Sequence, residues 1–563
     1  MLDPTALDAD VAALRAAAGE WATTPLAGKR RLLEAVRGAT AAVAEEWVRV
    51  CCQGKGIATG SPAAGEEWMS GPYAVLVNVA ALVRLLGRLE AGASPLDRLR
   101  ARALPGGRVA LRVFPSLPED RLVVGYSAEV WLRPGITLEQ AETGVARRLR
   151  EPGQPGRVAL VLGAGNISSI PPLDALAKLY QDNAVTLIKL NPVNADLEPV
   201  LNRALAPLVE RGFVRVTSGG ADVGSYLAHH PDVDAVHITG NAASHDALVF
   251  GPGEEGARRK RARRPLLTKP VTSELGGVGP VVVVGGRWSD AAVAAQAESV
   301  VTQRLHNSGF NCIASQIVVL PRSWPEADRF LEHLRRGLRA APGRVAWYPG
   351  AADRQRAAVA AHPGAELLGG DPEVPRTLLA DLDPGDADEP AFRTEYFGPV
   401  LGVTRLPGDS PAEFLDNAVT FCNERLQGDL GAGLIAAPRT LRELGPRVEA
   451  GIARLRYGAV AVNCWVGPIF GMPRATWGAY PGHDLHDVGS GVGIVHNALL
   501  LDPGHVERTV GRGPFRPWPK PLWSVTNRTA QVTGERMTRF AAEASWGRAV
   551  PRVLAAIASS LRG

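Results

Sequence analysis

Two segments decide how this chain is interpreted: TKPVTSELGGVGPVVVV at residues 268–284 and HNSGFNCIASQIVVL at residues 306–320. The first places an acidic residue, Glu274, before a Gly-Gly turn and a run of valines typical of a buried strand. The second places a lone cysteine, Cys312, on a short turn between a predicted helix and a predicted strand.

The chemistry of a cysteine and a glutamate suggests a reaction in two steps. A thiol attacks as its thiolate, which requires a neighbouring group or a local field. A carboxylate beside it can activate water as a general base. Cys312 and Glu274 could therefore perform covalent capture followed by hydrolysis. A single cysteine is more often a buried apolar residue, so the residue types alone leave a structural role open.

Composition sets broad limits. The chain has 563 residues, 46% of them hydrophobic, which is enough for two or three domains with substantial cores. A net charge of +5 gives no indication of nucleic-acid binding. The five cysteines form no metal-ligand pattern. The start of the chain lacks the basic and then apolar pattern of a signal peptide. No run of about 18 uncharged apolar residues, long enough to span a bilayer, occurs. We expect a soluble, cytoplasmic protein without a metal site or stable membrane insertion.

From Gly156 onward, short apolar strands alternate with amphipathic helices. This alternation predicts an α/β fold with a doubly wound parallel sheet that binds a nucleotide at the carboxyl ends of its strands. The helices are expected near residues 171–182, 196–211, 221–229 and 242–250. The strands are expected at Val158–Leu162, Val185–Leu190, Phe213–Thr217, Ala235–Thr239 and Val281–Val284.

The segment GAGNIS at residues 163–168 follows the first of these strands. It begins like a dinucleotide-binding fingerprint but lacks the third glycine, and the next strand ends in Lys189 where an acid would hold a ribose. As a phosphate loop the match is weak. An asparagine after glycine, here Asn166, is more often explained by turn formation.

The motifs SELGG and NSGFNCIAS resemble the two active-site signatures of the aldehyde dehydrogenase superfamily, in the same order and at a similar separation. LIKLNP, PDVDAVHITGNAASHDAL and TEYFGPVLGV, which start at residues 187, 231 and 394, resemble further motifs of that family. The resemblance implies an NAD(P)-binding domain, an α/β catalytic domain and a small oligomerisation element. It also implies oxidation of an aldehyde to a carboxylic acid, with NAD or NADP as cofactor, by a homo-oligomer (a dimer or tetramer).

The same resemblance assigns roles to individual residues. Cys312 is expected to be the nucleophile, Glu274 the base that activates water, and Asn166 a donor to the oxyanion. The expected cofactor contacts are Lys189 at the adenosine ribose, Gly240 and Asn241 at the pyrophosphate, Glu395 at the nicotinamide ribose and Phe397 near the ring.

Some positions depart from the family pattern. Pro192 occupies the place of a frequent ribose-binding acid, which removes a charge that would repel a 2′-phosphate. NADP is therefore expected to serve at least comparably to NAD. His245 replaces a glycine of the pyrophosphate turn, and Phe310 and Asn311 precede the nucleophile in place of the common residues.

The expected domains are residues 1–272 for NAD(P) binding, with a β arm near 104–155, then 273–465 for catalysis and 466–563 for a substrate-mouth loop and tail. A basic insertion at 251–265 is expected to be a solvated loop, although it could meet coenzyme A phosphates. Two terminal helices are expected at 534–548 and 551–561. The aromatic residues that could line a substrate tunnel, or only pack the mouth loop, are Trp465, Phe470, Trp477 and Tyr480.

Two alternatives stay open. A CoA-acylating dehydrogenase or acyl-CoA reductase would use Cys312 in the same way, with a thiol in place of water. A catalytically silent relative would keep the fold for assembly or binding. The joint presence of Cys312, Glu274 and Asn166 argues against the silent relative.

Overall fold

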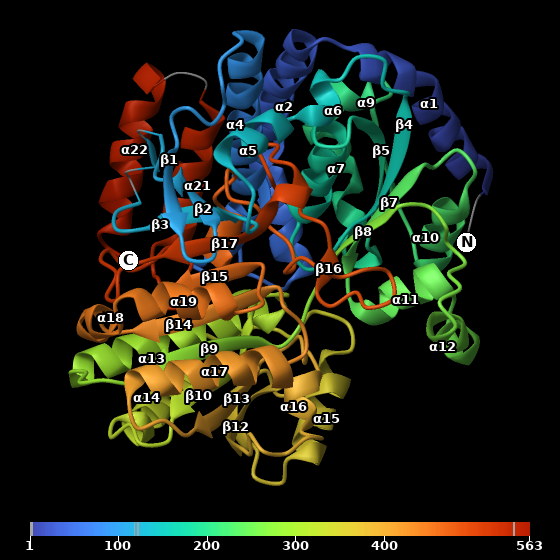
Figure 1. Ribbon diagram of the computed structural model, residues 1–563. Helices are drawn as coiled ribbons and strands as arrows, with labels where there is room; N and C mark the ends of the chain where they lie inside the picture. The colour runs from blue at the N-terminus through green and yellow to red at the C-terminus, as the bar shows by residue number, and fades with distance from the viewer. Residues whose placement is uncertain (1–3, 118, 121–122, 544–545) are drawn as a thin grey trace.

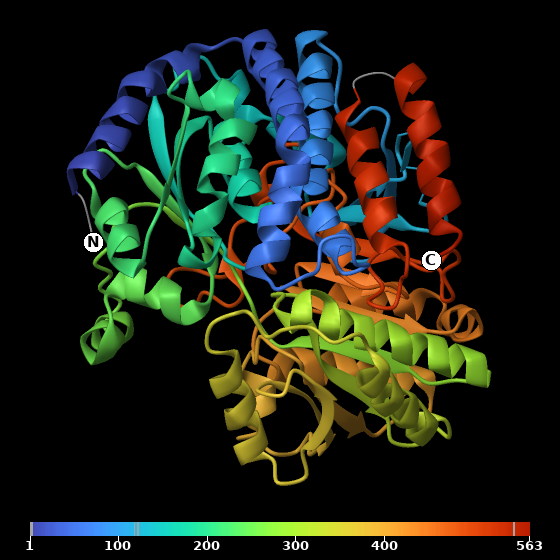
Figure 2. The ribbon, with the colours of Figure 1, turned by 180° about the vertical axis from the view of Figure 1, so that it is seen from behind.

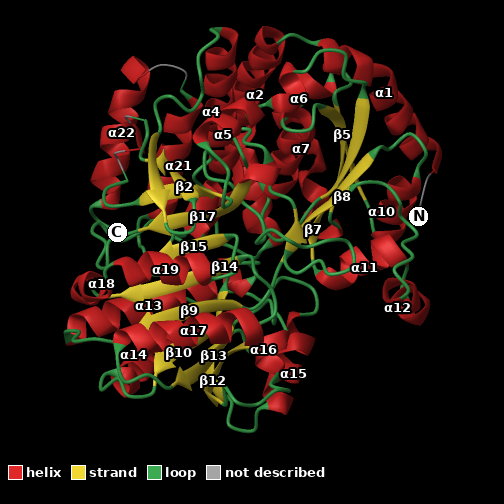
Figure 3. Cartoon of the chain, viewed as in Figure 1, coloured by secondary structure: helices red, strands yellow, loops and turns green. Residues whose placement is uncertain are grey.

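The protein, seen in a computed structural model, contains two β-sheets, and the chain crosses from one to the other several times (Figures 1 and 3). The structure describes residues 4–117, 119–120, 123–543 and 546–563. One sheet has six strands and the other has eleven, and helices cover both. The predicted α/β class with a doubly wound parallel sheet is confirmed.

The six-stranded sheet has the strand order β16-β8-β7-β4-β5-β6. All neighbours from β8 to β6 run parallel, and β16 pairs with β8 antiparallel. Parallel strands are buried on both faces, which explains the nearly continuous apolar runs noted in the sequence. Its strands are β4 (Arg157–Leu162), β5 (Ala184–Leu190), β6 (Val214–Ser218), β7 (Ala235–Gly240), β8 (Val271–Leu275) and β16 (Gly491–Val492).

One strand of this sheet was predicted wrongly. Val281–Val284 belongs to β9 (Gly279–Val284), which lies in the other sheet, and the strand next to β7 is β8 (Val271–Leu275). A run of valines predicts a buried strand of a parallel sheet, but it does not indicate which of two sheets the strand belongs to. Three of the five residues of β8, VTSEL, are polar, so the strand lacks the apolar signal of a core strand.

The eleven-stranded sheet has the order β1-β2-β3-β17-β15-β14-β9-β10-β13-β12-β11. Neighbours from β17 to β12 run parallel, and the strands at both ends are antiparallel. Its strands are β1 (Arg100–Leu104), β2 (Arg108–Phe114), β3 (Ser127–Leu132), β9 (Gly279–Val284), β10 (Ser315–Pro321), β11 (Glu366–Gly370), β12 (Pro375–Leu382), β13 (Val400–Leu406), β14 (Gly431–Ala436), β15 (Ala459–Val462) and β17 (Val506–Arg512).

Alternation along β9 shows how the two faces of this sheet are covered. Val281 and Val283 pack into one apolar cluster with α13 (Asp290–Leu305) and α14 (Ala327–Ala340). Val282 and Val284 pack into another, which contains residues of α17 (Pro411–Arg425) and α19 (Pro446–Arg454). Successive side chains of a strand point to opposite faces, so the two helix layers sandwich the sheet (Figures 1 and 2).

The region of the β arm expected near 104–155 contains β2 and β3, which lie outside the six-stranded sheet. β3 pairs with β17, and β17 pairs with β15, so these strands extend the large sheet of their own chain.

The nucleotide-fold helices lie close to their expected positions. They are α7 (Ile170–Tyr180), α8 (Glu198–Ala204), α9 (Ala206–Val209), α10 (Ala221–His229) and α11 (Ala242–Phe250). The N-terminal helices α1 (Pro4–Thr23) and α2 (Leu26–Gly54) pack beside them, α1 against β5 and α2 against α8.

The basic insertion is a helix, α12 (Gly253–Arg261), and the expectation of a loop was wrong. Glu254 and Glu255 lie in its first turn and four basic residues lie in its last turn. Charges in this order complement the helix dipole and stabilise so short a helix.

A helical region near the N-terminus forms part of the core. It comprises α3 (Ala64–Trp68), η1 (Met69–Tyr73) and α4 (Ala74–Glu90). By length and composition Ala64–Glu90 could cross a membrane, but 61% of its most apolar window is buried inside the protein, as in a core helix. The end of the chain forms α21 (Ala530–Ala542) and α22 (Trp546–Ser560), and α21 lies beside α2 in Figure 2. Residues 544–545 of the helix predicted at 534–548 lie outside the described residues.

Candidate active site

Cys312 lies in the turn that leads from α13 into β10. The chain first makes a short 3-10 segment, His306–Gly309, in which Asn307 and Ser308 adopt positive φ angles of 53° and 57°. These left-handed residues reverse the chain, so Cys312 emerges at the amino end of β10. Its thiol donates to the Oε1 atom of Glu274 over 3.6 Å.

Glu274 reaches the thiol from the other sheet. It lies on β8, is only 2% exposed, and its Oε1 atom also accepts a hydrogen bond of 2.8 Å from the indole N–H of Trp477. Its second oxygen, Oε2, is buried and has no partner among the described residues. Burial raises the pKa of the Glu274 carboxyl, while the charge of His496 and the Trp477 donor oppose that rise.

The same environment also shifts the pKa of the Cys312 thiol. Burial, followed by the charges of Glu274 and Glu395, raises the pKa of Cys312 well above its ordinary value. The backbone N–H of Cys312 opposes this shift. A thiolate and a carboxylate this close repel each other, so the resting pair holds at least one proton.

Asn166 lies in the loop after β4 and is 6% exposed. Its amide nitrogen donates to the carbonyl oxygen of Phe310 over 2.9 Å, two residues before Cys312. A side-chain amide carries two N–H groups, so one remains for an oxygen inside the cavity that Asn166 lines.

A buried lysine that sequence reasoning missed organises this loop. The ammonium of Lys55 lies 2.9 Å from Glu67 Oε1, 3.1 Å from the carbonyl oxygen of Asn166 and 3.0 Å from the Asn307 side chain. Asn307 in turn donates to the carbonyl oxygens of Asn166 and Phe310, each over 3.0 Å. Lys55 is far from these residues in sequence, and no motif around it signals this contact.

The residues expected at the adenosine side lie at the carboxyl edge of the six-stranded sheet. Lys189 is near the end of β5, Gly240 ends β7, and Asn241 caps α11 by accepting from the backbone N–H of Ser244 over 2.8 Å. Lys189 is 8% exposed, and burial lowers the pKa of its ammonium, an effect that the nearby Asp222 opposes.

Asp222 supplies a carboxylate that was not expected near Lys189. It belongs to the first turn of α10, which follows the next strand, β6, so the residues around Pro192 do not reveal it. His245, the other unusual residue of this region, is fully buried on α11 beside Asp246.

Glu395 and Phe397 lie between α16 (Pro390–Arg393) and β13, and Phe397 is close to the loop that carries Cys312. Burial raises the pKa of Glu395 to about 8, and its Oε1 atom has no partner among the described residues. A Cβ atom on Gly276 would lie 2.1 Å from the other carboxylate oxygen, so only glycine fits the SELGG turn there. Phe397 packs against Phe310, with ring centroids 5.9 Å apart.

Cys312, Glu274 and Asn166 line one cavity of about 140 Å³. Trp465, Phe470 and Trp477 supply much of its apolar wall. Tyr480, the fourth aromatic residue considered for this role, lies elsewhere, where its hydroxyl donates to Glu507 over 3.0 Å.

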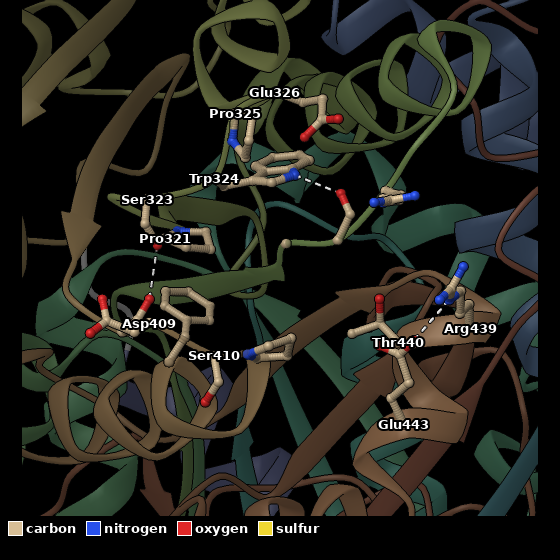
Figure 4. A pocket seen from close by; sticks show the side chains of 16 residues that line it. Pro321, Ser323, Trp324, Pro325, Glu326, Asp409, Ser410, Arg439, Thr440 and Glu443 are labelled. Atoms are coloured by element: carbon tan, nitrogen blue, oxygen red, sulfur yellow. Dashed lines mark hydrogen bonds and ion pairs between the residues drawn. The ribbon is translucent and has the colours of Figure 1, made fainter.

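A larger cavity of about 510 Å³ lies at the opposite edge of the large sheet (Figure 4). It opens beyond Pro321, the last residue of β10, whereas Cys312 precedes the first. Trp324 and Thr440 face it, and its lining contains neither cysteine nor histidine. We therefore assign the candidate active site to the smaller cavity.

Comparison with known proteins agrees with this assignment. The model of the aldehyde dehydrogenase family matches residues 196–344, which include Glu274 and Cys312. Aminoacetaldehyde dehydrogenase of Pseudomonas aeruginosa is 27% identical over 275 residues, 45% of this chain and 48% of that protein. The 3,6-anhydro-alpha-L-galactose dehydrogenase of Streptomyces coelicolor is 30% identical over 298 residues, 48% of this chain and 54% of that protein. The chain thus spans about half the length of the curated relatives it matches.

Solved structures resemble the whole fold. Aldehyde dehydrogenase C of Pseudomonas syringae, determined with NAD+ and octanal, aligns with a TM-score of 0.58 and 19% identity, covering 91% of this chain and 90% of that one. The aldehyde dehydrogenase of Mycobacterium tuberculosis, determined with NAD+, gives a TM-score of 0.58 and 18% identity over the same shares.

Fold and site together define a two-sheet α/β protein with a cysteine and a glutamate facing each other where the sheets meet. Residues 196–344 of this chain match the aldehyde dehydrogenase family, and its whole fold is similar to that of solved aldehyde dehydrogenases.

Proposed function

We propose that this protein oxidises an aldehyde to a carboxylic acid with NAD or NADP. The observation that carries the proposal is the 3.6 Å contact between Cys312 Sγ and Glu274 Oε1, inside a cavity that Asn166 also lines. It places a nucleophile, a base and a hydrogen-bond donor around one space.

The reaction would begin at Cys312. Its thiolate attacks the carbonyl carbon, and the carbonyl oxygen becomes an oxyanion. The free N–H of Asn166 and the backbone N–H of Cys312 are the donors proposed to hold it. A single such donor is typically worth about 3–4 kcal/mol. The raised pKa of Cys312 requires that its proton leave as the substrate binds.

The chain offers suitable groups for a nicotinamide dinucleotide. The unpartnered Oε1 of Glu395 can accept a hydrogen bond from a sugar hydroxyl. Lys189, Gly240 and Asn241 are proposed to hold the adenosine and phosphate end, and Phe397 to pack beside the ring. When bound, this cofactor supplies the hydride acceptor for the oxidation.

Glu274 is proposed to complete the reaction. Loss of a hydride from the oxyanion adduct to the bound cofactor would leave a thioester on Sγ. Glu274 lies beside Sγ, so a water molecule at the thioester carbonyl would be within its reach. The carboxylate takes a proton from that water as the water attacks, and the acid leaves. Burial raises the affinity of Glu274 for this proton, which suits a general base near neutral pH.

The CoA-acylating alternative receives less support from α12. Arg258 and Arg259 pair with Glu255, and Lys260 lies 2.7 Å from Asp246, so acids of the same region offset much of this positive charge. A silent scaffold would have no need for the close contact between Cys312 and Glu274. We retain hydrolysis as the proposed outcome.

Assembly and location are separate proposals. We propose a cytoplasmic homo-oligomer, a dimer or tetramer, as suggested by the family resemblance. Sedimentation equilibrium of the purified protein would test the assembly, and a single monomeric species would refute it.

The function is tested by supplying a panel of aldehydes with NAD or NADP and identifying the products by mass. We expect a carboxylic acid and one reduced cofactor per aldehyde. Turnover that depends on coenzyme A and yields an acyl-CoA would support the alternative. No turnover with any aldehyde, with cofactor binding intact, would favour the silent relative.

A further inference from the structure

The C-terminal segment after β17 returns to the catalytic cavity. Leu522 and Trp523 of this segment line the same space as Cys312, together with residues 66–73 of the N-terminal helical region. They lie well beyond the motifs that carry the family resemblance, and the proposed mechanism assigns them no role.

Contacts on both sides fix this segment. The ammonium of Lys520 lies 3.0 Å from Glu298 on α13, and the backbone N–H of Val525 donates to Thr302 of the same helix over 3.4 Å. The Trp523 ring meets the edge of the Tyr126 ring at a centroid distance of 5.4 Å. Leu522 and Trp523 are therefore held in the cavity wall by residues before and after them.

The next part of the tail supports the opposite wall. Helix α21 packs on α3, where a Cβ atom on Gly65 would lie 2.6 Å from the carbonyl oxygen of Ala530. Residues adjacent to this close approach, Glu66, Met69 and Tyr73, line the cavity. The tail thus contributes to the cavity directly through two side chains and indirectly through α21.

Leu522 also separates two spaces. It lines the inner cavity of about 140 Å³ and an outer one of about 540 Å³, and Glu66 is the other residue common to both. Glu66 is paired with Arg344 at 2.8 Å. The outer cavity is bordered by apolar residues that include Ile57, Pro62, Val345 and Val525.

We propose that Leu522 and Trp523 determine substrate specificity, and that the substrates are aldehydes with an apolar body. The inference rests on the proposed function. With the aldehyde carbon at Cys312, the Trp523 ring packs beside the body of the substrate together with Phe470 and Trp477. Leu522 limits how far a chain extends toward the outer cavity.

Steady-state kinetics with hexanal and dodecanal test this role in the full-length protein. Leu522→Ala should raise the ratio of kcat/KM for dodecanal over hexanal about tenfold, within the range that apolar pockets achieve per methylene. Trp523→Ala should lower kcat/KM for hexanal about tenfold, mainly through KM. Trp518→Ala is the matched control, because that side chain lies in the same segment and is 77% exposed.

A second measurement does not depend on turnover. The measurement is the alkylation ratio, which is the rate of Cys312 alkylation by N-octyl iodoacetamide divided by its rate with iodoacetamide. We expect this ratio to be about tenfold lower in Trp523→Ala than in the wild type. It should be unchanged in Trp518→Ala. Circular dichroism confirms that each variant is folded.

The two measurements separate the possible failures. If the wild type oxidises no aldehyde, the proposed function is wrong, and the alkylation ratio alone decides the specificity role. An unchanged alkylation ratio in Trp523→Ala, or kcat/KM ratios within twofold of wild type in both variants, overturns the proposal.

Discussion

The Sγ atom of Cys312 lies 3.6 Å from Oε1 of Glu274, and the same oxygen accepts a 2.8 Å hydrogen bond from Trp477. The thiol comes from the eleven-stranded sheet and the carboxylate from the six-stranded one. The pair therefore exists only when both sheets are folded and docked, and the charge of Glu274 helps to raise the pKa of Cys312.

A first prediction concerns thiol reactivity in Glu274→Gln. The charge of Glu274 helps to raise the pKa of Cys312, so its removal should lower that pKa and increase the thiolate fraction at pH 8. Iodoacetamide should alkylate Cys312 faster in this variant than in the wild type without cofactor. Slower alkylation would show instead that Glu274 acts as the base that deprotonates the thiol.

A second prediction concerns the pH dependence of hydrolysis in Trp477→Phe. The indole N–H stabilises the charged form of Glu274, so its loss should raise the pKa of that carboxyl further. In the pH profile of kcat, the acidic limb should therefore move to higher pH. The value of kcat at pH 7 should fall about tenfold, because a hydrogen bond to a charged group is worth about 1.5 kcal/mol.

Trp465→Phe provides the matched control for that experiment. Trp465 lines the same cavity, but its indole donates to the backbone of Ile313 over 3.1 Å. An equal shift of the acidic limb in both variants would show that loss of the Trp477 hydrogen bond does not cause the shift.

These two predictions involve residues that sequence reasoning found to different degrees. The motifs around Cys312 and Glu274 identified both partners, because short local segments carry their signatures. β8 was missed as a strand, because three of its five residues are polar and its burial comes from its neighbours in the sheet.

Residues placed by long-range packing gave no local signal. Lys55 reaches Asn166 and Asn307 across the fold, and Trp523 enters the cavity from the far end of the chain. Spacing and periodicity describe a single element, so they do not reveal which distant elements meet at a site.

A third prediction concerns the stability of the Lys55–Glu67 pair. Both side chains are almost fully buried, and Lys55→Met would leave the Glu67 carboxylate without its cation. Breaking one side of a buried pair typically costs about 3–5 kcal/mol. Urea unfolding should show a loss of that size, and the double variant Lys55→Met/Glu67→Gln should recover part of it. A loss below about 1 kcal/mol in the single variant would contradict the assigned role.

A fourth prediction concerns cofactor choice. Pro192 suggested that no acid would repel a 2′-phosphate, but the structure places Asp222 near Lys189. Asp222→Asn should therefore raise kcat/KM for NADP relative to NAD by about tenfold. An unchanged ratio would mean that Asp222 does not approach the adenosine ribose.

A last prediction concerns the proposed division of labour, in which Cys312 captures the aldehyde and Glu274 releases the acid. Glu274→Gln is mixed with an aldehyde and the cofactor and quenched rapidly, and the intact protein is analysed by mass spectrometry. We expect a burst of about one reduced cofactor per active subunit and an acyl adduct on Cys312, which is absent from Cys312→Ala. Continuous acid formation by Glu274→Gln at the wild-type rate, without an adduct, would contradict these roles.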